Sequence, residues 1–296
     1  MELTDKQKGI ALSLIGVLVI TPDSLFVRLI DLSSLELLFY RGLIPFFCLL
    51  ILLTFLYKKK IFKKIVFIGL PGLFYAILIA LGNFTFVISL ENTNVANTLI
   101  MIALTPFATA ILSAIFIKEN PGKRMWFIII SCFLVVLFIF YDSFQGNRLY
   151  GDLFGLLAAI FVGGAAVVVR YSKSFDFLPA LLFAKLLTFF IPLFLINSFP
   201  NSLSLDFKNL FLVIAMGICL FIPLTCITIA PKYIPAYEVE IFFVLETIIG
   251  PIWVWLIINE EPTIKTLIGG IVIILLILTH TFLELKKERK AYLLNQ

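Results

Sequence analysis

The sequence predicts an all-α integral membrane protein with ten transmembrane helices, arranged as two inverted-topology five-helix repeats. Three observations lead to this prediction. The 296 residues are 61% hydrophobic and 14% charged, whereas soluble domains are about 25% charged. The apolar residues gather in runs of roughly 20 residues, the length that a membrane-spanning helix needs. Landmarks of the first half of the chain recur in the second half. One soluble core could not bury so many apolar residues, so lipid has to be the solvent.

Each apolar run is expected to form a helix rather than strands. The runs are long and do not alternate, and an open sheet cannot satisfy its backbone groups in lipid. Short breaks that carry Pro, Asn, Gly and charged residues separate them, as expected at helix ends. The ten predicted spans cover about residues 9–29, 35–57, 65–89, 94–117, 124–142, 150–170, 177–197, 208–231, 235–258 and 264–284.

The repeat is visible in the residues that close the fourth and ninth runs. The first run ends in Lys118-Glu119-Asn120-Pro121 and the second in Asn259-Glu260-Glu261-Pro262, with Glu119 and Glu260 141 residues apart. Five spans per repeat is an odd number, so the second repeat enters the membrane in the opposite orientation. We therefore expect a first repeat at 1–141, a polar linker at 142–149, a second repeat at 150–284 and a basic tail at 285–296.

The placement of Lys and Arg predicts the orientation in the membrane. With the N-terminus in the cytoplasm, 17 of these residues fall in inside segments and only 4 in outside segments. Basic residues concentrate on the cytoplasmic side of membrane proteins. Both termini are therefore expected in the cytoplasm, and the plasma (inner) membrane of a bacterium is the expected location.

Three charged positions stand out, because a charge in the middle of a bilayer is costly and marks a functional position. Asp23 and Arg41 lie at similar depths in the first and second spans and are able to pair. Such a pair either holds two helices together or contacts a substrate. Lys185 occupies, in the second repeat, the position that corresponds to Arg41. Its ammonium group either binds an anionic group of a substrate or is structural.

Three acidic residues of the ninth span, Glu238, Glu240 and Glu246, are expected within reach of Lys185. Glu246 lies deepest, and a carboxyl group in a dry interior can exchange a proton during a transport cycle. The alternative is that neutral Glu246 forms a hydrogen bond to a neighbouring helix. We predict that Asp23 and these three glutamates contribute to proton coupling or to an intramembrane ion pair.

Uncharged polar residues supply a further set of candidate lining residues. Asn83 and Asn97 belong to a cluster of asparagines on the third and fourth spans, while Tyr75 and Tyr237 offer hydroxyl groups and aromatic walls. Hydrogen bonds between helices would explain the asparagines equally well. These four residues complete the predicted substrate-binding set with Arg41 and Lys185.

Metal and cofactor chemistry finds no support in the sequence. The cysteines lie inside apolar runs without the paired spacing of a metal site, and no histidine accompanies them. The chain has no Gly-rich phosphate loop and no HExxH or GxSxG motif. We expect no cofactor, no metal, no nucleic-acid partner and no enzymatic activity. The four cysteines are Cys48, Cys132, Cys219 and Cys226.

In their order and spacing, these landmarks resemble the EamA branch of the drug/metabolite transporter superfamily. Leu104-Thr105-Pro106 followed by Glu119 resembles the end of the first EamA repeat, and Leu245-Glu246-Thr247 followed by Glu260 that of the second. Glu36 to Arg41 resembles the family's second-helix signature, which ends in arginine. The family often has proline where Thr247 stands, so a helix kink displaced toward Pro251 is expected here.

The resemblance implies a carrier of small organic solutes, including amino acids and other metabolites. We expect transport by alternating access, in which one repeat rocks against the other around a central cavity. The first four helices of each repeat would line the cavity and the fifth would brace it. The solute would carry a carboxylate or other anionic group that meets Arg41 or Lys185. Expected partners are this solute, the bilayer, a coupling proton and, as one oligomeric state left open, a second copy in a homodimer.

Two other functions are weighed against a carrier. A passive channel would not require the strict repeat. An integral-membrane enzyme acting on lipid would need a catalytic cluster at one membrane face, and the short loops carry no His-rich or paired-carboxylate motif. The enzyme is therefore the weaker alternative.

Overall fold

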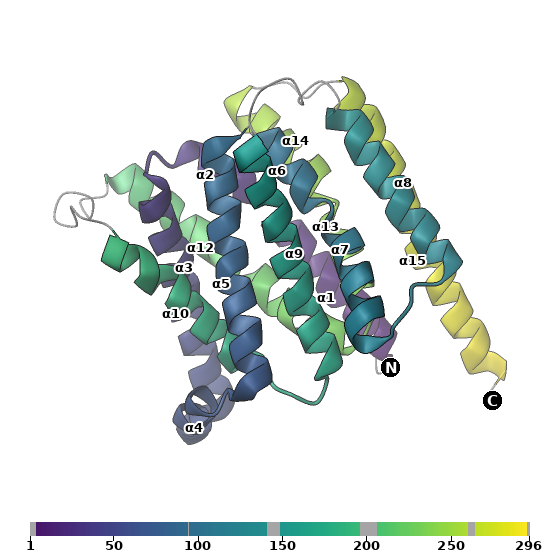
Figure 1. Cartoon of the computed structure of the whole chain (residues 1–296), viewed down its shortest axis with the longest axis horizontal. Helices are drawn as coiled ribbons and strands as arrows, with labels where there is room; N and C mark the ends of the chain where they lie inside the picture. Colours follow the sequence, from purple (N-terminus) through teal and green to yellow (C-terminus); the bar gives the residue numbers. More distant parts are fainter. Residues whose placement is uncertain (1–3, 94, 141–148, 196–205, 260–263, 295–296) are drawn as a thin grey trace.

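The computed structural model of the chain describes residues 4–93, 95–140, 149–195, 206–259 and 264–294, and those residues contain helices and no strand. Figure 1 shows helices that run mostly along one common direction. In chain order they are α1 (Asp5–Ile20), α2 (Asp23–Leu29), α3 (Ser34–Tyr57), η1 (Lys58–Lys60), α4 (Ile61–Val66), α5 (Gly69–Asn92), α6 (Val95–Ile102), α7 (Thr105–Leu112), η2 (Ser113–Ile117), α8 (Lys123–Phe140), α9 (Leu149–Tyr171), α10 (Leu178–Leu195), α12 (Phe207–Ile229), η4 (Ala230–Lys232), α13 (Ala236–Phe243), α14 (Glu246–Ile258) and α15 (Ile264–Leu294).

Local sequence signals explain where the first two long helices begin. Thr4 caps α1 and Ser33 caps α3, and each forms a reciprocal capping box with the residue three positions on, Gln7 or Glu36. Such boxes satisfy backbone N–H groups that have no partner within the helix. The Glu36 carboxylate is therefore engaged in capping the N-terminus of α3.

Several described helices are long and apolar enough to cross a membrane. Large apolar side chains remain exposed along the sides of the bundle, for example Phe55, Phe74 and Phe194. A surface of this kind faces lipid rather than water. The six segments of sufficient length are Asp5–Leu29, Ser34–Val66, Gly69–Asn92, Leu149–Tyr171, Phe207–Lys232 and Ala236–Ile258, and two shorter apolar helices are Thr105–Ile117 and Leu178–Phe194.

The internal repeat is present in the backbone as well as in the sequence. The fourth helical segment of the first half is interrupted at residues 103–104, between α6 and α7, and its counterpart at 244–245, between α13 and α14. Both segments end on a left-handed residue, Lys118 with φ 55° and Asn259 with φ 62°. A single left-handed residue is a common way to end a helix. The two breaks and the two terminal residues are each 141 positions apart.

The first helical segment departs from this symmetry. It breaks at Thr21-Pro22 between α1 and α2, whereas its counterpart α9 is continuous. Proline removes a backbone donor and crowds the preceding turn. The first segment has Pro22 at this point, and α9 has no proline.

Most of the packing joins helices of different repeats. α5 packs along α9, α3 along α10 and α12, and α1 along α12, while α7 contacts α9 and α13. α8 and α15 pack on each other at the outer edge of the bundle, as Figure 1 shows. The two halves of the sequence are therefore interleaved in space.

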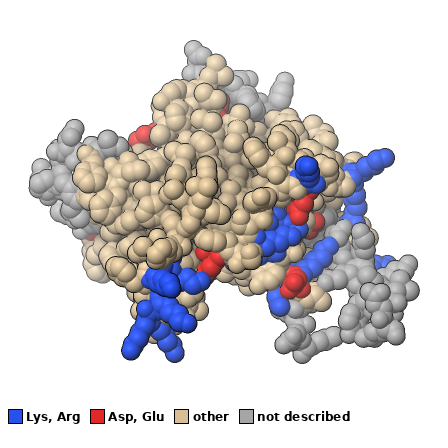
Figure 2. Space-filling model, turned by 60° about the horizontal axis from the view of Figure 1, so that its bottom comes forward, with Lys and Arg blue, Asp and Glu red and all other residues tan. Residues whose placement is uncertain are grey.

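One end of the bundle is strongly basic. Both chain termini and α4 lie at this end, the lower end in Figure 1. Figure 2 brings it forward and shows Lys and Arg side chains gathered there, with fewer acidic ones. We call it the basic end; its exposed lysines include Lys58, Lys59, Lys60, Lys63 and Lys64.

Candidate functional site

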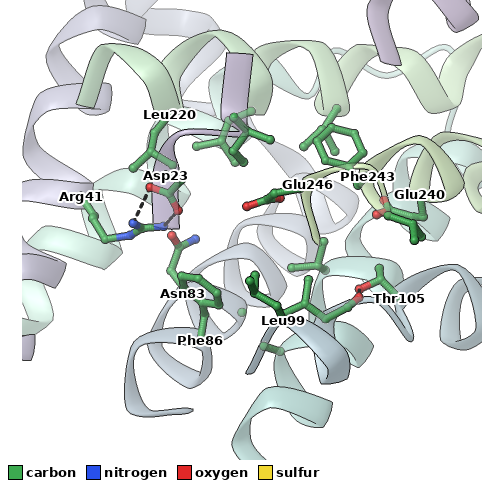
Figure 3. Close-up of a pocket in the computed structure, with 18 residues that line it drawn as sticks. Asp23, Arg41, Asn83, Phe86, Leu99, Thr105, Leu220, Glu240, Phe243 and Glu246 are labelled. Carbon is green, nitrogen blue, oxygen red and sulfur yellow. Dashed lines mark hydrogen bonds and ion pairs between the residues drawn. The ribbon is translucent and has the colours of Figure 1, made fainter. Parts of the chain in front are cut away.

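A cavity of about 120 Å³ lies inside the bundle. Its described lining comes from α1, α2, α3, α5, α6, α7, α9, α12, α13 and α14, with no residue from α8, α10 or α15. The lining is mostly apolar and carries a small number of charged and polar side chains, which Figure 3 shows. Ligand sites in proteins have this composition. The charged and amide residues among them are Asp23, Arg41, Asn83, Glu240 and Glu246.

All three helix breaks open onto this cavity. The breaks are at residues 21–22, 103–104 and 244–245, and lining residues lie on both sides of each. A break inside a membrane helix is tolerated where the freed backbone lines a cavity or is buried in protein. The breaks therefore mark the cavity as the polar centre of the bundle. The lining residues beside them are Ile20 and Asp23, Ile102 and Thr105, and Phe243, Val244 and Glu246.

A threonine hydroxyl donates a hydrogen bond at each break, and at two of the breaks it replaces a backbone donor that proline lacks. In an unbroken helix the carbonyls of Leu18 and Ile102 would accept hydrogen bonds from residues 22 and 106, which are both prolines and have no N–H. The hydroxyl of the threonine just before each proline donates to this carbonyl instead. In the second repeat, where no proline follows, the Thr247 hydroxyl makes the corresponding bond. The bonds are Thr21 Oγ1 to Leu18 O (3.0 Å), Thr105 Oγ1 to Ile102 O (2.6 Å) and Thr247 Oγ1 to Val244 O (2.7 Å).

The second-repeat break corrects the expectation of a kink displaced toward Pro251. The chain leaves the helix at 244–245, and α14 continues through Pro251 to Ile258. Thr247 donates from both its amide and its hydroxyl to the Val244 carbonyl, at 3.2 Å and 2.7 Å. This tight turn breaks the helix without proline.

Asp23 and Arg41 form a buried ion pair at one side of the cavity. Arg41 Nη1 donates to Asp23 Oδ1 at 2.8 Å and Nη2 to Oδ2 at 2.9 Å. The two side chains are 4% and 3% exposed, and the Arg41 guanidinium carbon lies 5.3 Å from the centre of the Phe86 ring. Two parallel bonds to a carboxylate are the strongest arrangement open to arginine. In this conformation Arg41 is engaged by the protein itself.

Lys185 lies behind the cavity wall rather than in it. The side chain is fully buried, and its Nζ donates to Asn83 Oδ1 at 3.3 Å. Asn83 in turn donates through Nδ2 to the Ile79 carbonyl at 2.8 Å. The sequence-based expectation placed ninth-span carboxyls around Lys185, but within the described part of the chain its hydrogen bond goes to this amide. The reason is that α10 packs chiefly against α3 and α5.

Glu240 and Glu246 face the cavity from opposite sides of the 244–245 break. Glu240 is 2% exposed and Glu246 9%. Glu240 Oε1 has no hydrogen-bond partner among the described residues, and no hydrogen bond or ion pair joins Glu246 to that part of the chain. Figure 3 shows Glu246 pointing into the middle of the cavity, between the Asp23–Arg41 pair and Glu240. These two carboxyls are the polar groups most available to a bound molecule.

Three of the other predicted site residues, Tyr75, Tyr237 and Glu238, lie away from the cavity. Tyr75 is buried and its hydroxyl lies 2.5 Å from Thr228 Oγ1. Tyr237 is part of an apolar cluster around α1 and α13, and Glu238 is half-buried in the first turn of α13. Neither lines the cavity. Asn97 belongs to α6, and its side chain lies outside the described residues.

Several residues around the cavity were not anticipated from the sequence. Phe86 and Phe243 provide aromatic walls. Trp253 Nε1 donates to Thr21 Oγ1 at 3.0 Å and so ties α14 to the first break. The two Thr-Pro dipeptides, at residues 21–22 and 105–106, were a usable signal for the breaks. Among 32 phenylalanines, no pattern distinguishes the two that line the cavity.

Ion pairs at the basic end connect the two repeats. Arg170 Nε donates to both carboxylate oxygens of Glu119, at 2.9 Å and 2.8 Å, and Lys64 Nζ lies 3.2 Å from Asp176 Oδ2. Burial would raise the pKa of Asp176, but hydrogen bonds from Tyr57 and Lys64 and the charge of Lys64 together lower it. These contacts hold helix ends of the two repeats together on this side of the cavity.

A second cavity of about 610 Å³ is apolar. It lies between α5, α7, η2 and α9, and its described lining holds no charged side chain. Such a lining offers no charged partner to a polar solute, so this cavity is a weaker candidate for solute recognition. Within the described residues no group of three or more His, Cys, Asp or Glu could hold a metal ion.

Comparison with known proteins identifies related sequences. The EamA-like transporter family matches residues 7–141 and 149–281. The pseudopaline exporter CntI of Pseudomonas aeruginosa is 26% identical over 188 residues, which is 60% of this chain and 63% of the exporter. The chain thus matches less than two thirds of the exporter's length. The uncharacterized transporter YdfC of Bacillus subtilis is 25% identical over 225 residues, 74% of this chain and 71% of YdfC.

A solved crystal structure has the same fold. It superposes with a TM-score of 0.73 and covers 94% of this chain and 98% of its own. The sequences are 14% identical, so this likeness concerns the fold alone.

Proposed function

Since the chain belongs to the EamA-like transporter family, we propose that it is a secondary transporter that moves a small organic metabolite across a membrane by alternating access. The observation that carries the proposal is the central cavity. It lies among helices of both repeats, contains buried charges and adjoins three broken helices. Secondary transporters commonly bind their solutes at such a position, where discontinuous helices meet near the middle of the bilayer.

The architecture we propose has ten spans in two inverted repeats. The matched residues 7–141 and 149–281 support two units of similar length, and the breaks and left-handed residues repeated at 141 positions support a common origin. Residues 142–149 then link the repeats, and 285–296 form a basic tail. α8 and α15 would brace the bundle, since they contribute nothing to the described lining of the cavity.

The orientation we propose places the basic end in the cytoplasm. Both termini lie at this end together with the lysines of η1 and α4. Lys and Arg near membrane surfaces are retained on the cytoplasmic side. The plasma (inner) membrane of a bacterium is the proposed location.

The moving parts we propose are not the two repeats as rigid bodies. α3, α5, α9, α10 and α12 pack together across the repeats, and so do α1, α7 and α13. Separating one repeat from the other would expose most of these interfaces. Two mixed bundles that tilt about the cavity would keep the contacts within each bundle and would shift those between them, such as α1–α12 and α7–α9. The three breaks supply places where the helices can bend.

The solute we propose is a small metabolite with polar groups. CntI is named an exporter of pseudopaline, and the cavity described here combines apolar walls with ionisable side chains. An anionic group, for instance the carboxylate of an amino acid, would reach Arg41 when the Asp23–Arg41 pair loosens during the cycle. Lys185 would support this site through Asn83.

Counterflow in proteoliposomes tests the proposal. A metabolite panel is first screened by thermal shift on purified protein, and each stabilising compound is then loaded into vesicles. We expect internal compound to accelerate uptake of the labelled compound, because a carrier returns faster when it is loaded. A passive channel shows no such acceleration. Chemical change of the compound or of vesicle lipid, without uptake, would favour the enzyme alternative.

Two substitutions test the anionic site. Lys185→Ala is expected to reduce transport far more than it reduces the amount of folded protein in the membrane. Arg41→Ala also leaves Asp23 buried without its partner, so its transport is compared per amount of folded protein and is expected to be lower on that basis as well. The matched control is Lys59→Ala, which removes an exposed lysine of η1 that does not line the cavity. If Lys185→Ala leaves the apparent affinity for the solute unchanged, Lys185 is structural and the anionic site is reduced to Arg41.

A further inference from the structure

We propose that the cavity binds a cationic amine head group of the solute between the carboxylates of Glu240 and Glu246. This inference rests on the proposed transport function and names the chemical class of one end of the transported molecule. The anionic contact at Arg41 concerns a different end and is independent of it.

The charges that line the cavity favour a cation. The described lining holds three carboxyl groups, of Asp23, Glu240 and Glu246, and a single base, Arg41. Asp23 and Arg41 neutralise each other through two hydrogen bonds. Lys185 does not line the cavity, and its ammonium group is directed to Asn83. Two carboxyls therefore remain without a basic partner inside the cavity.

The burial of these two carboxyls favours a cationic partner whenever they are ionised. Glu240 is 2% exposed and Glu246 9%, and Glu240 Oε1 has no hydrogen-bond partner among the described residues. A buried carboxylate without a partner is strongly unfavourable, whereas one that meets an opposite charge with good hydrogen bonds is retained. An ammonium group supplies both the charge and up to three N–H donors.

The shape of the cavity agrees with a head group of this kind. Its volume of about 120 Å³ corresponds to roughly four water molecules at about 30 Å³ each, which is enough for an ammonium head group, while the body of the solute has to extend past the cavity. Pockets that enclose a whole drug-sized ligand begin at about 300 Å³. Phe243 lies beside the two glutamates (Figure 3), and an aromatic ring favours both a nearby cation and an apolar body.

The position of the two glutamates connects binding to the helix break. Glu240 belongs to α13 and Glu246 begins α14, so the 244–245 break lies between them. A cation that contacts both carboxylates would draw the two half-helices together. This contact would be made and lost as the break opens and closes.

Binding of three matched compounds tests the inference. The probes are phenethylammonium, 2-phenylethanol and phenylacetate, which share the ring and differ in charge. Equilibrium binding of each labelled probe to purified full-length protein is measured with sodium and with potassium as the salt. We expect phenethylammonium to bind and the alcohol and the anion to bind at least roughly tenfold more weakly, because only the cation pairs with the carboxylates.

Variants locate the binding to the two glutamates. Glu246→Gln and Glu240→Gln are each expected to weaken phenethylammonium binding roughly tenfold or more. Glu91→Gln is the matched control, since it removes an exposed carboxyl from α5 that does not line the cavity. Folding of each variant is checked by gel filtration and thermal unfolding before binding is measured.

Each outcome bears on one proposal or the other. Preference for phenylacetate or the alcohol, no binding of any probe by folded protein, or competition by sodium alone would overturn the inference. Equal binding by Glu91→Gln, Glu246→Gln and Glu240→Gln would overturn it as well. Cation binding without counterflow would support the inference and contradict the carrier. Counterflow of phenylacetate, but not of the amine, would do the reverse.

Discussion

Asp23 and Arg41 carry opposite charges that the protein interior accepts only together. Their side chains are 3% and 4% exposed, so neither charge can be solvated by water when its partner is removed. Arg41 also lies over the Phe86 ring. The pair joins α2 to α3 beside the cavity, and a loss of one member should therefore be felt as a loss of stability.

We predict that Arg41→Met destabilises the folded protein by about 3–5 kcal/mol, the usual cost of leaving one member of a buried pair uncompensated. Asp23→Asn should have a similar effect, and the double variant should recover most of the loss. Thermal or denaturant unfolding in detergent measures these differences. The control is Asp5→Asn at the exposed Asp5–Lys8 pair, which should change little. A single variant that is as harmless as this control would contradict the prediction.

Glu246 is the residue at which proton coupling is predicted. Glu246→Gln keeps the shape and one acceptor but cannot release a proton. We expect proton-driven accumulation of solute to be lost, while exchange of solute for solute persists at saturating concentration. Uptake into proteoliposomes under an imposed pH gradient makes the measurement. Equal accumulation by the variant and the parent would remove the proton role.

The sequence analysis selected charged and polar residues within the spans as candidate site residues. Five of these candidates line the cavity, namely Asp23, Arg41, Asn83, Glu240 and Glu246. What it could not provide is the direction in which each side chain points around its helix. Lys185 shows this clearly: its depth in the seventh span was predicted, but its partner Asn83 depends on α10 packing against α5. Tyr237 likewise faces an apolar cluster because of how α13 is rotated.

The close packing of one helix pair, α3 and α10, depends on a glycine. A Cβ added at Gly42 of α3 would lie 2.7 Å from Phe189 Cβ and 2.9 Å from Phe189 Cα on α10. Real Cβ atoms do not come so near, and the obstacle is backbone that cannot rotate away. α3 and α10 therefore pack as closely as they do because residue 42 has no side chain.

We predict that Gly42→Ala destabilises the protein by about 1–3 kcal/mol through overpacking. Gly122→Ala is the control, because a Cβ there would meet nothing within 4 Å. The midpoint of thermal unfolding in detergent distinguishes the two. If both variants unfold at the same temperature as the parent, the α3–α10 contact is looser than described.

The positions of the helix breaks could be predicted from the sequence only in part. The two Thr-Pro dipeptides at residues 21–22 and 105–106 are visible in the sequence, and a break is found at or just before each. The third break was expected near Pro251 and lies at 244–245 instead. There a threonine hydroxyl bonded to the Val244 carbonyl takes part in the turn. A hydrogen bond of this kind leaves no pattern in composition or hydropathy.

At the scale of the whole molecule, the basic end predicts the topology. Labelling of single cysteines in intact cells with a membrane-impermeant reagent makes the measurement. We expect Asn147→Cys, in the linker between the repeats, to react from outside and Lys60→Cys to react only after the membrane is opened. The reverse labelling pattern would invert the proposed orientation.

The interleaving of the repeats predicts how the halves behave when separated. Residues 1–145 and 146–296, expressed as two chains, should accumulate in the membrane and copurify only when they are produced together. The reason is that α3 and α5 pack chiefly on α9, α10 and α12. Membrane levels and copurification of tagged halves provide the measurement. A first half that is monodisperse and folded by itself would contradict the expectation.

This interleaving also governs biogenesis. α3 and α5 leave the ribosome well before α9 and α10 exist, so their packing surfaces meet lipid during that interval. Gly42 and the buried Arg41 are then exposed to the bilayer without Phe189 above the glycine. Arg41 can already pair with Asp23, because both belong to the first half. The ion pair thus neutralises both buried charges of the first half before the second half is synthesised. A chain that ends in the linker would leave the packing surfaces of α3 and α5 uncovered, and membrane proteases would have access to it.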